Sequence, residues 1–325
     1  MERSGHEFDW LAIHKSSPRI NGRMTPATEE KRKELLSFIE RVLQPEPAVQ
    51  AVIGIGSIAT GYMRPESDID VVVFFDPMDW YIIPAEFIWR PVDGSYHSIF
   101  IEDDEILKEG IGLDCRRLDL SLWGDPGFEW PEGRKAELCD GWLSFDRDGK
   151  IAPLIDSKTV YSEELRLERL DEAITWLDQH LADGGPEQRW ETLGPAVAHA
   201  RLYAAFQQLI RALFALNRRW MPWLNRQMDN LLRLPWLPDG FDEHVLVASN
   251  APSLDYHGYM ERATALRSLF EDLLSQLVED GSYSTASIDQ AFIRSHDEPG
   301  YSWNMEEWRA ENIGRFLTMV TEKDE

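Results

Sequence analysis

The first half of the chain alternates short apolar runs with turn residues, a pattern typical of β-strands in a mixed domain. Four segments are predicted as strands: residues 51–55, 71–75, 96–101 and 116–123. In the last of them Leu118, Leu120 and Leu122 alternate with polar residues, so they would share one face of a sheet. Residues 142–151 are predicted to form a hairpin that adds an edge to this sheet, with its turn at Asp148-Gly149.

Apolar residues recur at helical spacing before the first strand and throughout the second half of the chain. Ser162 is the predicted N-cap of a helix that Gly184-Gly185-Pro186 ends. One further predicted helix starts at Thr28 or Pro26 and runs through Leu43. The others cover residues 102–107, 192–217, 256–278 and 303–319 and the segment between Pro222 and Pro235. We therefore expect an α+β fold, with a small mixed β-sheet flanked by helices over residues 1–158 and an all-α helical bundle over residues 159–325.

The amino-acid composition of the chain limits the kinds of molecule that it is expected to bind. The chain has 58 Asp and Glu residues against 33 Lys and Arg, a formal net charge of −25. Such a surface repels phosphates, so a nucleic-acid partner is not expected; a polycationic small acceptor fits the charge, as do plain solubility and adaptation to salt. No apolar run is long enough to span a bilayer, and Cys115 and Cys139 give neither a metal spacing nor a disulfide framework. We expect a cytoplasmic protein without a membrane segment.

Candidate chemistry gathers around the first two strands. Gly56-Ser57 ends the first strand, and Asp68 and Asp70 open the second. Because strand side chains alternate, both carboxylates should project from the same side, where their mutual repulsion calls for a cation. Hard oxygen ligands suit Mg²⁺, which commonly takes one or two carboxylates and substrate phosphates. Gly56 permits close backbone approach to an anion, so this stretch predicts a metal and phosphate site.

The pattern also resembles a known signature. Gly56-Ser57, then Gly61, then a Pro-x-Ser-Asp-x-Asp run from Pro65 to Asp70, is similar to the motif of the nucleotidyltransferase superfamily, which has the polymerase-β-like fold. The subgroup it most resembles is the small-molecule or aminoglycoside type. The resemblance implies ATP or another NTP as co-substrate, two Mg²⁺ ions held by the aspartates, and phosphates bound at Gly56, Ser57 and Ser67. It also implies a catalytic domain followed by a helical one.

A third carboxylate is expected on a neighbouring strand by the same resemblance, and Asp119 is the position that matches. It would ligate Mg²⁺ or act as the base that deprotonates the acceptor hydroxyl. An aspartate among apolar strand neighbours needs a partner or a metal, so an ion pair with Arg116 or Arg117 is the alternative interpretation. Asp114 and Asp125 are weaker substitutes for Asp119.

The helical half contains a local concentration of positive charge. Residues 199–235 hold a single acid, Asp229, and six arginines: Arg201, Arg211, Arg218, Arg219, Arg226 and Arg233. Arginine offers planar bidentate donors to phosphate, so Arg218 and Arg219 are predicted to complete the nucleotide site. The alternative is that these arginines pair with acids of neighbouring helices and cover apolar surface with their stems.

The resemblance and the acids together predict a Mg²⁺-dependent nucleotidyltransferase. It would move an NMP group, with AMP favoured, from an NTP to a hydroxyl of a small-molecule acceptor and release pyrophosphate. The alternatives are a protein AMPylase of toxin–antitoxin type and a nucleotide-binding regulatory protein without turnover. The acceptor and the base preference stay open.

Overall fold

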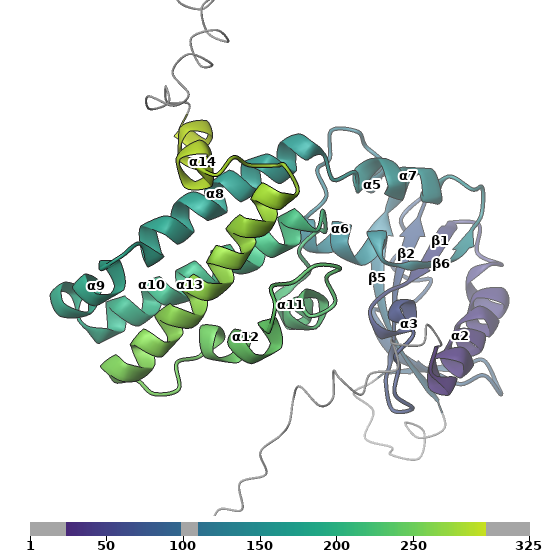
Figure 1. Cartoon of the computed structure of the whole chain (residues 1–325). Coiled ribbons are helices and arrows are strands. Elements are labelled where there is room, and N and C mark those ends of the chain that lie inside the picture. Colours follow the sequence, from purple (N-terminus) through teal and green to yellow (C-terminus); the bar gives the residue numbers. More distant parts are fainter. Residues whose placement is uncertain (1–23, 99–109, 297–325) are drawn as a thin grey trace, which may run out of the picture. The chain divides into compact units, whose positions relative to one another are not determined.

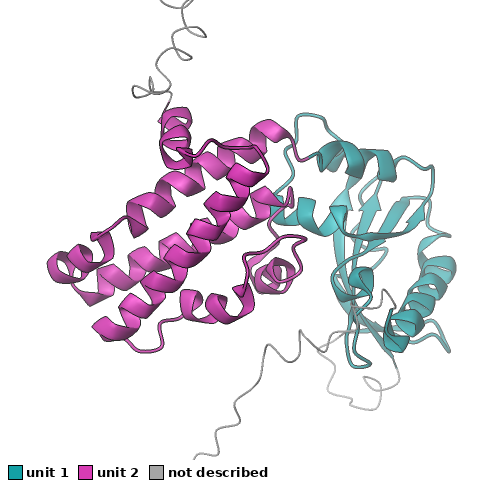
Figure 2. Cartoon of the chain, in the orientation of Figure 1, with its two compact units in different colours: residues 1–160 teal, residues 161–325 magenta. Residues whose placement is uncertain are grey.

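The computed structural model describes residues 24–98 and 110–296. The chain divides into two compact units, residues 1–160 and residues 161–325, which differ in architecture (Figures 1 and 2). The first is built around a β-sheet and the second is helical throughout its described part, which confirms the expected fold class. The helices predicted at residues 102–107 and 303–319, and the end of the strand predicted at residues 96–101, lie outside the described residues.

A mixed six-stranded sheet forms the centre of the first unit, with the order β4-β3-β5-β2-β1-β6. The strands are β1 (Val49–Gly54), β2 (Ile69–Phe75), β3 (Glu86–Trp89), β4 (Tyr96–Ser98), β5 (Ile111–Asp119) and β6 (Trp142–Asp146). The central strands β2 and β5 pair in parallel, and the other neighbours pair in antiparallel fashion. The predicted edge at residues 142–151 is therefore present as β6, paired with β1.

Both faces of this sheet are covered, which explains why β1 and β2 are nearly continuous apolar runs. Helix α2 (Pro26–Phe38) continues as a π-helical turn, η2 (Ile39–Leu43), and its apolar residues pack on one face together with Val71 and Val73. Helices α6 (Glu132–Cys139) and α7 (Ile151–Lys158) cover the other face, where they meet Val72 and Phe74. Each face therefore has its own hydrophobic core.

Two predictions in this unit were wrong in detail. The strand predicted at residues 116–123 begins earlier and ends at Asp119, because the Asp119 carboxylate accepts a hydrogen bond of 2.9 Å from the amide of Ser121 and starts the short helix α5 (Leu120–Trp123). The segment after Gly149 is helix α7 and not the second strand of a hairpin. Its first turn is fixed by Asp146, whose carboxylate accepts hydrogen bonds from the amides of Ile151 and Ala152.

The second unit is a bundle around three long helices, α8, α10 and α13, which share one buried apolar core. Its helices are α8 (Glu163–Leu181), α9 (Gly185–Leu193), α10 (Pro195–Leu216), α11 (Leu224–Leu231), α12 (Phe241–Ser249), α13 (Tyr256–Glu279) and α14 (Ser287–His296). The predicted cap is confirmed, since Ser162 Oγ accepts from the amide of Leu165 at 3.1 Å. The structure adds α9, α12 and α14 to the predicted set; Gly194, at φ +80°, separates α9 from α10.

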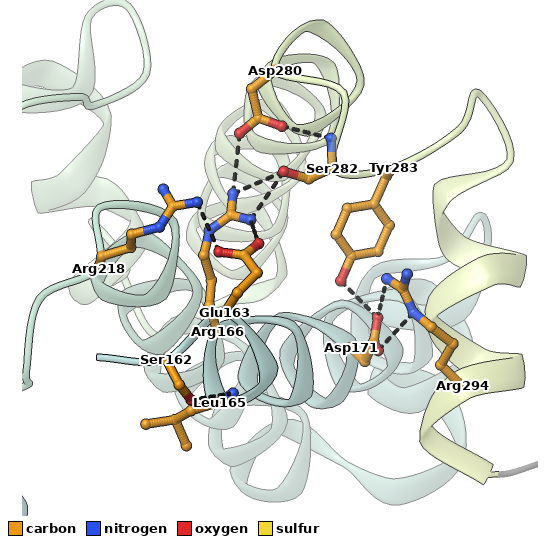
Figure 3. A network of polar contacts seen from close by, with 10 residues as sticks. All are labelled: Ser162, Glu163, Leu165, Arg166, Asp171, Arg218, Asp280, Ser282, Tyr283 and Arg294. Carbon is orange, nitrogen blue, oxygen red and sulfur yellow. Dashed lines mark hydrogen bonds and ion pairs between the residues drawn. The ribbon is translucent and has the colours of Figure 1, made fainter. Parts of the chain in front are cut away.

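A polar network joins the start of α8 to the end of α13 (Figure 3). Arg166 is only 1% exposed and bonds to Glu163, Asp280 and Ser282 at 2.7 to 3.0 Å. Glu163 also accepts from Arg218 at 2.8 Å. The buried guanidinium therefore has two carboxylates and a hydroxyl around it, as a charge in a protein interior requires.

A second buried carboxylate, Asp171, joins α8 to α14 in the same view (Figure 3). It accepts from the Tyr283 hydroxyl at 2.6 Å and from both Nε and Nη2 of Arg294 at 2.9 Å. Burial raises the pKa of Asp171, while the bonds from Arg294 and Tyr283 act in the opposite direction. This carboxylate is thus part of the packing of the bundle.

Candidate functional site

Asp68 and Asp70 lie on the same side of the sheet. Ile69 and Val71 point into the core under α2, and Asp70 stands between them as the second residue of β2. Since side chains alternate along a strand, Asp70 projects toward the opposite face, and so does Asp68 two residues earlier. Asp68 is exposed and Asp70 is half-buried. The two carboxylates therefore share one end of one sheet face.

The Gly-Ser turn lies beside this pair because β1 runs antiparallel to β2. Gly54 pairs with Val71, and the amide of Ile55 donates to the carbonyl of Asp70 at 2.9 Å. Gly56 follows at φ +63°, a conformation that side chains other than glycine rarely adopt, and it begins the four-residue helix α3 (Ser57–Thr60). The turn therefore stands at the end of β1 that adjoins the start of β2.

Arg32 holds the short helix α3 in place from α2. Its Nη2 donates to the carbonyl oxygens of Ile58 and Ala59 at 2.8 and 3.0 Å, and its Nε donates to Ile58 at 3.1 Å. These carbonyls are at the C-terminal end of α3, where a cation is favoured. Burial lowers the pKa of Arg32. The Gly-Ser turn is thus supported by a fixed scaffold.

The acid beside the pair is Asp114, and the expectation that placed Asp119 there was wrong. In the parallel pairing of β2 and β5, Asp70 is opposite Asp114, whereas Asp119 is opposite Phe75 at the other end of the strand. Five residues of strand separate the two acids by about 16 Å. Asp119 also has the opposite side-chain direction, because Phe75 belongs to the core under α2. Its carboxylate accepts from the amide and hydroxyl of Ser121.

The sequence did contain a signal for this strand. Ile111, Leu113 and Cys115 are buried in the core under α2 and alternate with Gly112 and Asp114. This period of two is typical of a strand with one apolar face, but the glycine and the aspartate interrupt the apolar run. The alternation identifies the strand, and the register against β2 then selects Asp114.

Gly112 makes room for the carboxylate of Asp68. It is one residue before Leu113, which pairs with Ile69, so Gly112 lies next to Asp68 across the two strands. A β-carbon added at Gly112 would be 2.2 Å from Asp68 Oδ1 and 2.9 Å from its Cγ. The Asp68 side chain therefore occupies the space above β5 that any larger residue at position 112 would fill.

A basic side chain from the same strand neutralises Asp114. Arg116 Nη1 is 3.0 Å from Asp114 Oδ1, and Arg116 Nη2 donates to Oδ2 at 3.1 Å. The Arg116 side chain is 48% exposed and that of Asp114 is 26% exposed. Asp114 Oδ1 is nevertheless buried without a hydrogen bond of good geometry among the described residues. The contact of Oδ1 is therefore the ion pair with Arg116, without a well-directed hydrogen bond.

Further charges surround these residues. Arg134 on α6 donates to Glu137 at 2.6 Å, and its pKa is lowered by burial and by Arg116, while Glu137 and Asp114 raise it. On the other side of β5, burial and then the charge of Asp114 raise the pKa of the Cys115 thiol, with Asp70 acting in the same direction. The charges of Asp70 and Asp114 thus both raise the pKa of the same residue, Cys115.

The remaining predicted residues have structural contacts of their own. Ser67 Oγ accepts from the amide of Arg64 at 3.2 Å in the turn before Asp68. Arg218 belongs to the second unit, at φ +50° in the turn after α10, where it donates to Glu163. This contact follows the alternative interpretation of the arginine-rich segment, as does the ion pair of Arg211 with Glu172 on α8. Arg233 instead pairs with Asp229 within the segment.

A hollow in the second unit has the wrong chemistry for a triphosphate. It has a volume of about 410 Å³, it is mostly apolar, and Arg201 is the charged residue among those that line it: Trp176, His180, Val197, Ala200, Arg201, Ala204 and Gln208. Burial lowers the pKa of His180 to about 4, so its ring is neutral at pH 7, and Arg189 and Arg201 act in the same direction. The hollow belongs to the apolar packing of α8 against α10.

The oxygen donors beside the Gly-Ser turn fit a divalent cation bound together with a nucleotide. Within residues 24–98 and 110–296, no three acidic, His or Cys side chains are close enough to form a metal site by themselves. Asp68 and Asp70 supply two carboxylates on one face, and Asp114 adds a buried oxygen without a hydrogen bond. Mg²⁺ commonly takes one or two carboxylates and completes its shell with phosphates and water, so this donor set suits it.

One comparison with known proteins, the match to a family model, agrees with the predicted superfamily. Residues 24–113 match the family model described as nucleotidyltransferase domain. A crystal structure of a nucleotidyltransferase-like protein from Exiguobacterium sibiricum is similar over 92% of this chain and 91% of that one, with 14% sequence identity and a TM-score of 0.33. No curated protein matches the chain. Residues 24–113 are therefore similar to a nucleotidyltransferase domain.

The matched segment contains Gly56, Ser57, Asp68 and Asp70 of the site but not Asp114. It begins at α2, includes β1, the Gly-Ser turn and β2, and ends one residue before Asp114. The match supports nucleotidyl transfer as the general activity. Among the described helices none is both long and apolar enough to cross a bilayer.

Proposed function

We propose that the chain is a Mg²⁺-dependent nucleotidyltransferase that moves an NMP group, with AMP favoured, from an NTP to a hydroxyl of a small-molecule acceptor. Pyrophosphate would be the second product. The observation that carries the proposal is the pairing of β2 with β5, which puts Asp114 beside Asp70 and Gly112 beside Asp68. Three acids then belong to one end of one sheet face, next to a turn suited to phosphate.

Asp68 and Asp70 would hold the metal, and Gly56 and Ser57 would bind the phosphates through backbone amides. Bound Mg²⁺ supplies neutralisation of the charge that develops on the attacking and leaving oxygens. Ser67 fixes the turn that delivers Asp68, and Gly112 leaves space for the carboxylate to lie over β5. Asp114 would act as the third acid, either as a further ligand or as the base that accepts the proton of the acceptor hydroxyl.

Arg218 and Arg219 remain part of the proposal as counter-charges for the triphosphate. The exposure of Arg218, whose side chain is 53% accessible in its pair with Glu163, supports its availability to an anion. Replacing Arg218 with Ala and titrating ATP is the test. A fall of about tenfold in affinity is expected from the loss of a charge-assisted bidentate contact; unchanged affinity would remove Arg218 from the proposed site, and Arg219→Ala tests Arg219 in the same way.

The boundary at residue 158 and a cytoplasmic location belong to the proposal too. Neither Cys115 nor Cys139 is in a disulfide, and Cys139 is exposed. Exposed thiols persist in reducing compartments, which supports the location. The acidic composition supports an acceptor other than nucleic acid.

A panel of acceptors tests the proposed reaction. Aminoglycosides, lincosamides and other hydroxylated metabolites would be incubated with ATP, Mg²⁺ and the full chain, and the products analysed by mass spectrometry for a nucleotide adduct. A mass increase of one AMP on an acceptor, with pyrophosphate released, is expected. Asp70→Asn is the control and should reduce turnover by about 10³-fold while the protein stays folded. Equal turnover in Asp70→Asn would contradict the assignment.

The same incubation distinguishes the other two predicted activities. Labelled ATP with a cell lysate would reveal AMP on protein bands if the acceptor is a protein. Intact NTP bound with Mg²⁺, and no product with any acceptor, would indicate a regulatory nucleotide-binding protein. Either outcome would overturn the small-molecule acceptor and leave the site assignment standing.

A further inference from the structure

Arg116 forms a bidentate contact with Asp114, one of the three acids. Both of its terminal nitrogens approach the two oxygens of Asp114, at 3.0 and 3.1 Å. This contact occupies the carboxylate that the proposed reaction needs. The side chains of Asp114 and Arg116 therefore cannot keep this contact while Asp114 serves as a ligand or base.

The ion pair between Asp114 and Arg116 can be broken at low energetic cost. Arg116 is half-exposed, so water can replace its bonds at little cost, and exposed ion pairs contribute roughly 0–1 kcal/mol. Asp114 Oδ1 stays without a well-directed hydrogen bond despite the ion pair. A buried oxygen in this state gains from a better partner. Neither group is held in place by a network like that around Arg166.

The guanidinium has an equally good alternative partner in the proposed substrate. Planar arginine donors match phosphate oxygens as well as they match a carboxylate. A bound NTP brings a triphosphate to the same end of the sheet face. Arg134, the neighbouring cation on α6, is instead held by Glu137 at 2.6 Å.

We propose, on the basis of the function proposed above, that Arg116 is a positioning residue that exchanges partners, holding Asp114 before substrate binds and turning to the triphosphate of the NTP when Asp114 is released. The exchange keeps Asp114 from attracting a cation in the absence of nucleotide. It couples the arrival of the nucleotide to the completion of the acidic site. The substrate class recognised by Arg116 is thus a nucleoside triphosphate bound with a divalent cation.

Two binding measurements test the exchange without turnover. Mn²⁺ binding alone is followed by the loss of its free electron paramagnetic resonance signal, and binding of a non-hydrolysable ATP analogue is measured by calorimetry at saturating Mg²⁺. Arg116→Gln should bind Mn²⁺ roughly two- to fivefold more tightly, because its competitor for Asp114 is gone. The same variant should bind the analogue about tenfold more weakly, because a bidentate phosphate contact is lost.

Arg117→Gln is the matched control, because it removes the same charge from the adjacent residue. Arg117 points to the other side of β5 and donates to the carbonyl oxygens of Trp80 and Ile83. It should change each affinity by less than about twofold, since it contacts neither Asp114 nor the proposed nucleotide. Equal effects in Arg116→Gln and Arg117→Gln would reduce the result to general electrostatics and overturn the exchange.

A double-mutant cycle makes the test specific to the pair. In an Asp114→Asn background, Arg116→Gln should no longer raise Mn²⁺ affinity, because the carboxylate for which Arg116 and Mn²⁺ compete is absent. A persistent gain there would overturn the exchange even if the nucleotide result held. Weakening of both ligands by Arg116→Gln would show a purely structural role. If the unaltered chain bound neither Mn²⁺ nor the analogue, the proposed function would fail first, and the exchange with it.

Discussion

Charged residues are treated in opposite ways by the two units of this chain. In the helical unit the buried charges Arg166 and Asp171 are bonded from several directions (Figure 3), although Arg166 Nε has no hydrogen bond among the described residues. In the sheet unit Asp68 is exposed, and Asp114 is paired with one half-exposed arginine, whose contact to Oδ1 is not a well-directed hydrogen bond. Satisfied buried networks fix one structure, whereas under-satisfied charges at an accessible edge are suited to binding. The difference separates the charged residues that stabilise the helical unit from those proposed to bind metal and nucleotide.

The helical network should carry stability without affecting the site. Arg166→Ala would leave Glu163 and Asp280 without a buried partner, and we expect the free energy of unfolding of the helical unit to fall by about 3 kcal/mol. Chemical denaturation followed by circular dichroism measures this. Arg211→Ala is the control, because its pair with Glu172 is exposed, and it should cost about 0.5 kcal/mol. Equal losses of unfolding free energy in Arg166→Ala and Arg211→Ala would show that the buried network stabilises the unit no more than an exposed ion pair does.

The helical core should also show its own sensitivity to acid. His180 is 3% exposed, its Nδ1 has no hydrogen bond among the described residues, and burial lowers its pKa to about 4. Between pH 6.5 and pH 4 the unfolded chain binds the proton more readily than the folded one, so stability falls as pH falls through this range. By pH 4.5 the loss should be about 2 kcal/mol.

The loss assigned to His180 is isolated by a variant that cannot titrate. His180→Gln should be less stable than the original chain at pH 7, because the stacking of the ring on Trp176 is lost. Between pH 7 and pH 4.5, however, it should lose about 2 kcal/mol less than the original chain does. Parallel pH profiles for the two proteins would show that His180 is not the acid-sensitive group.

In the sheet unit, by contrast, a substitution at the site should weaken ligand binding while leaving the free energy of unfolding nearly unchanged. Gly112→Ala puts a β-carbon where Asp68 Oδ1 lies, so the flexible carboxylate must move away. We expect about tenfold weaker binding of the Mg²⁺–nucleotide analogue, the equivalent of 1.4 kcal/mol, and a change in unfolding free energy below about 1 kcal/mol. In an Asp68→Asn background the substitution should add little. A large additional loss there would show that Gly112 matters for another reason.

Local patterns predicted much of the fold, because several elements are specified within their own segments. The apolar runs of β1 and β2 identify buried strands, and Ser162 with its two following acids identifies the start of α8. Helix α13 agrees with its predicted range to within a residue. The separation of α9 from α10 was missed, because Gly194 acts through a positive φ that no periodicity reveals.

Local patterns could not identify Asp114 as the third acid of the site, because its position beside Asp70 depends on pairing between strands that are distant in the sequence. Asp114 and Asp119 are both aspartates on β5, and only the register against β2 tells which one is beside Asp70. Register is set by the packing of whole strands. The pattern of Leu118, Leu120 and Leu122 favoured the wrong end of the strand, since Leu120 and Leu122 belong to α5.

The most direct test of the central claim compares the two acids of β5 in the same assay. Asp114→Asn and Asp119→Asn remove one charge each, and binding of a non-hydrolysable ATP analogue with Mg²⁺ is measured for both. The account predicts that Asp114→Asn loses at least about tenfold in affinity, while Asp119→Asn binds as the original chain does. Normal binding by Asp114→Asn together with a loss in Asp119→Asn would contradict the site described above.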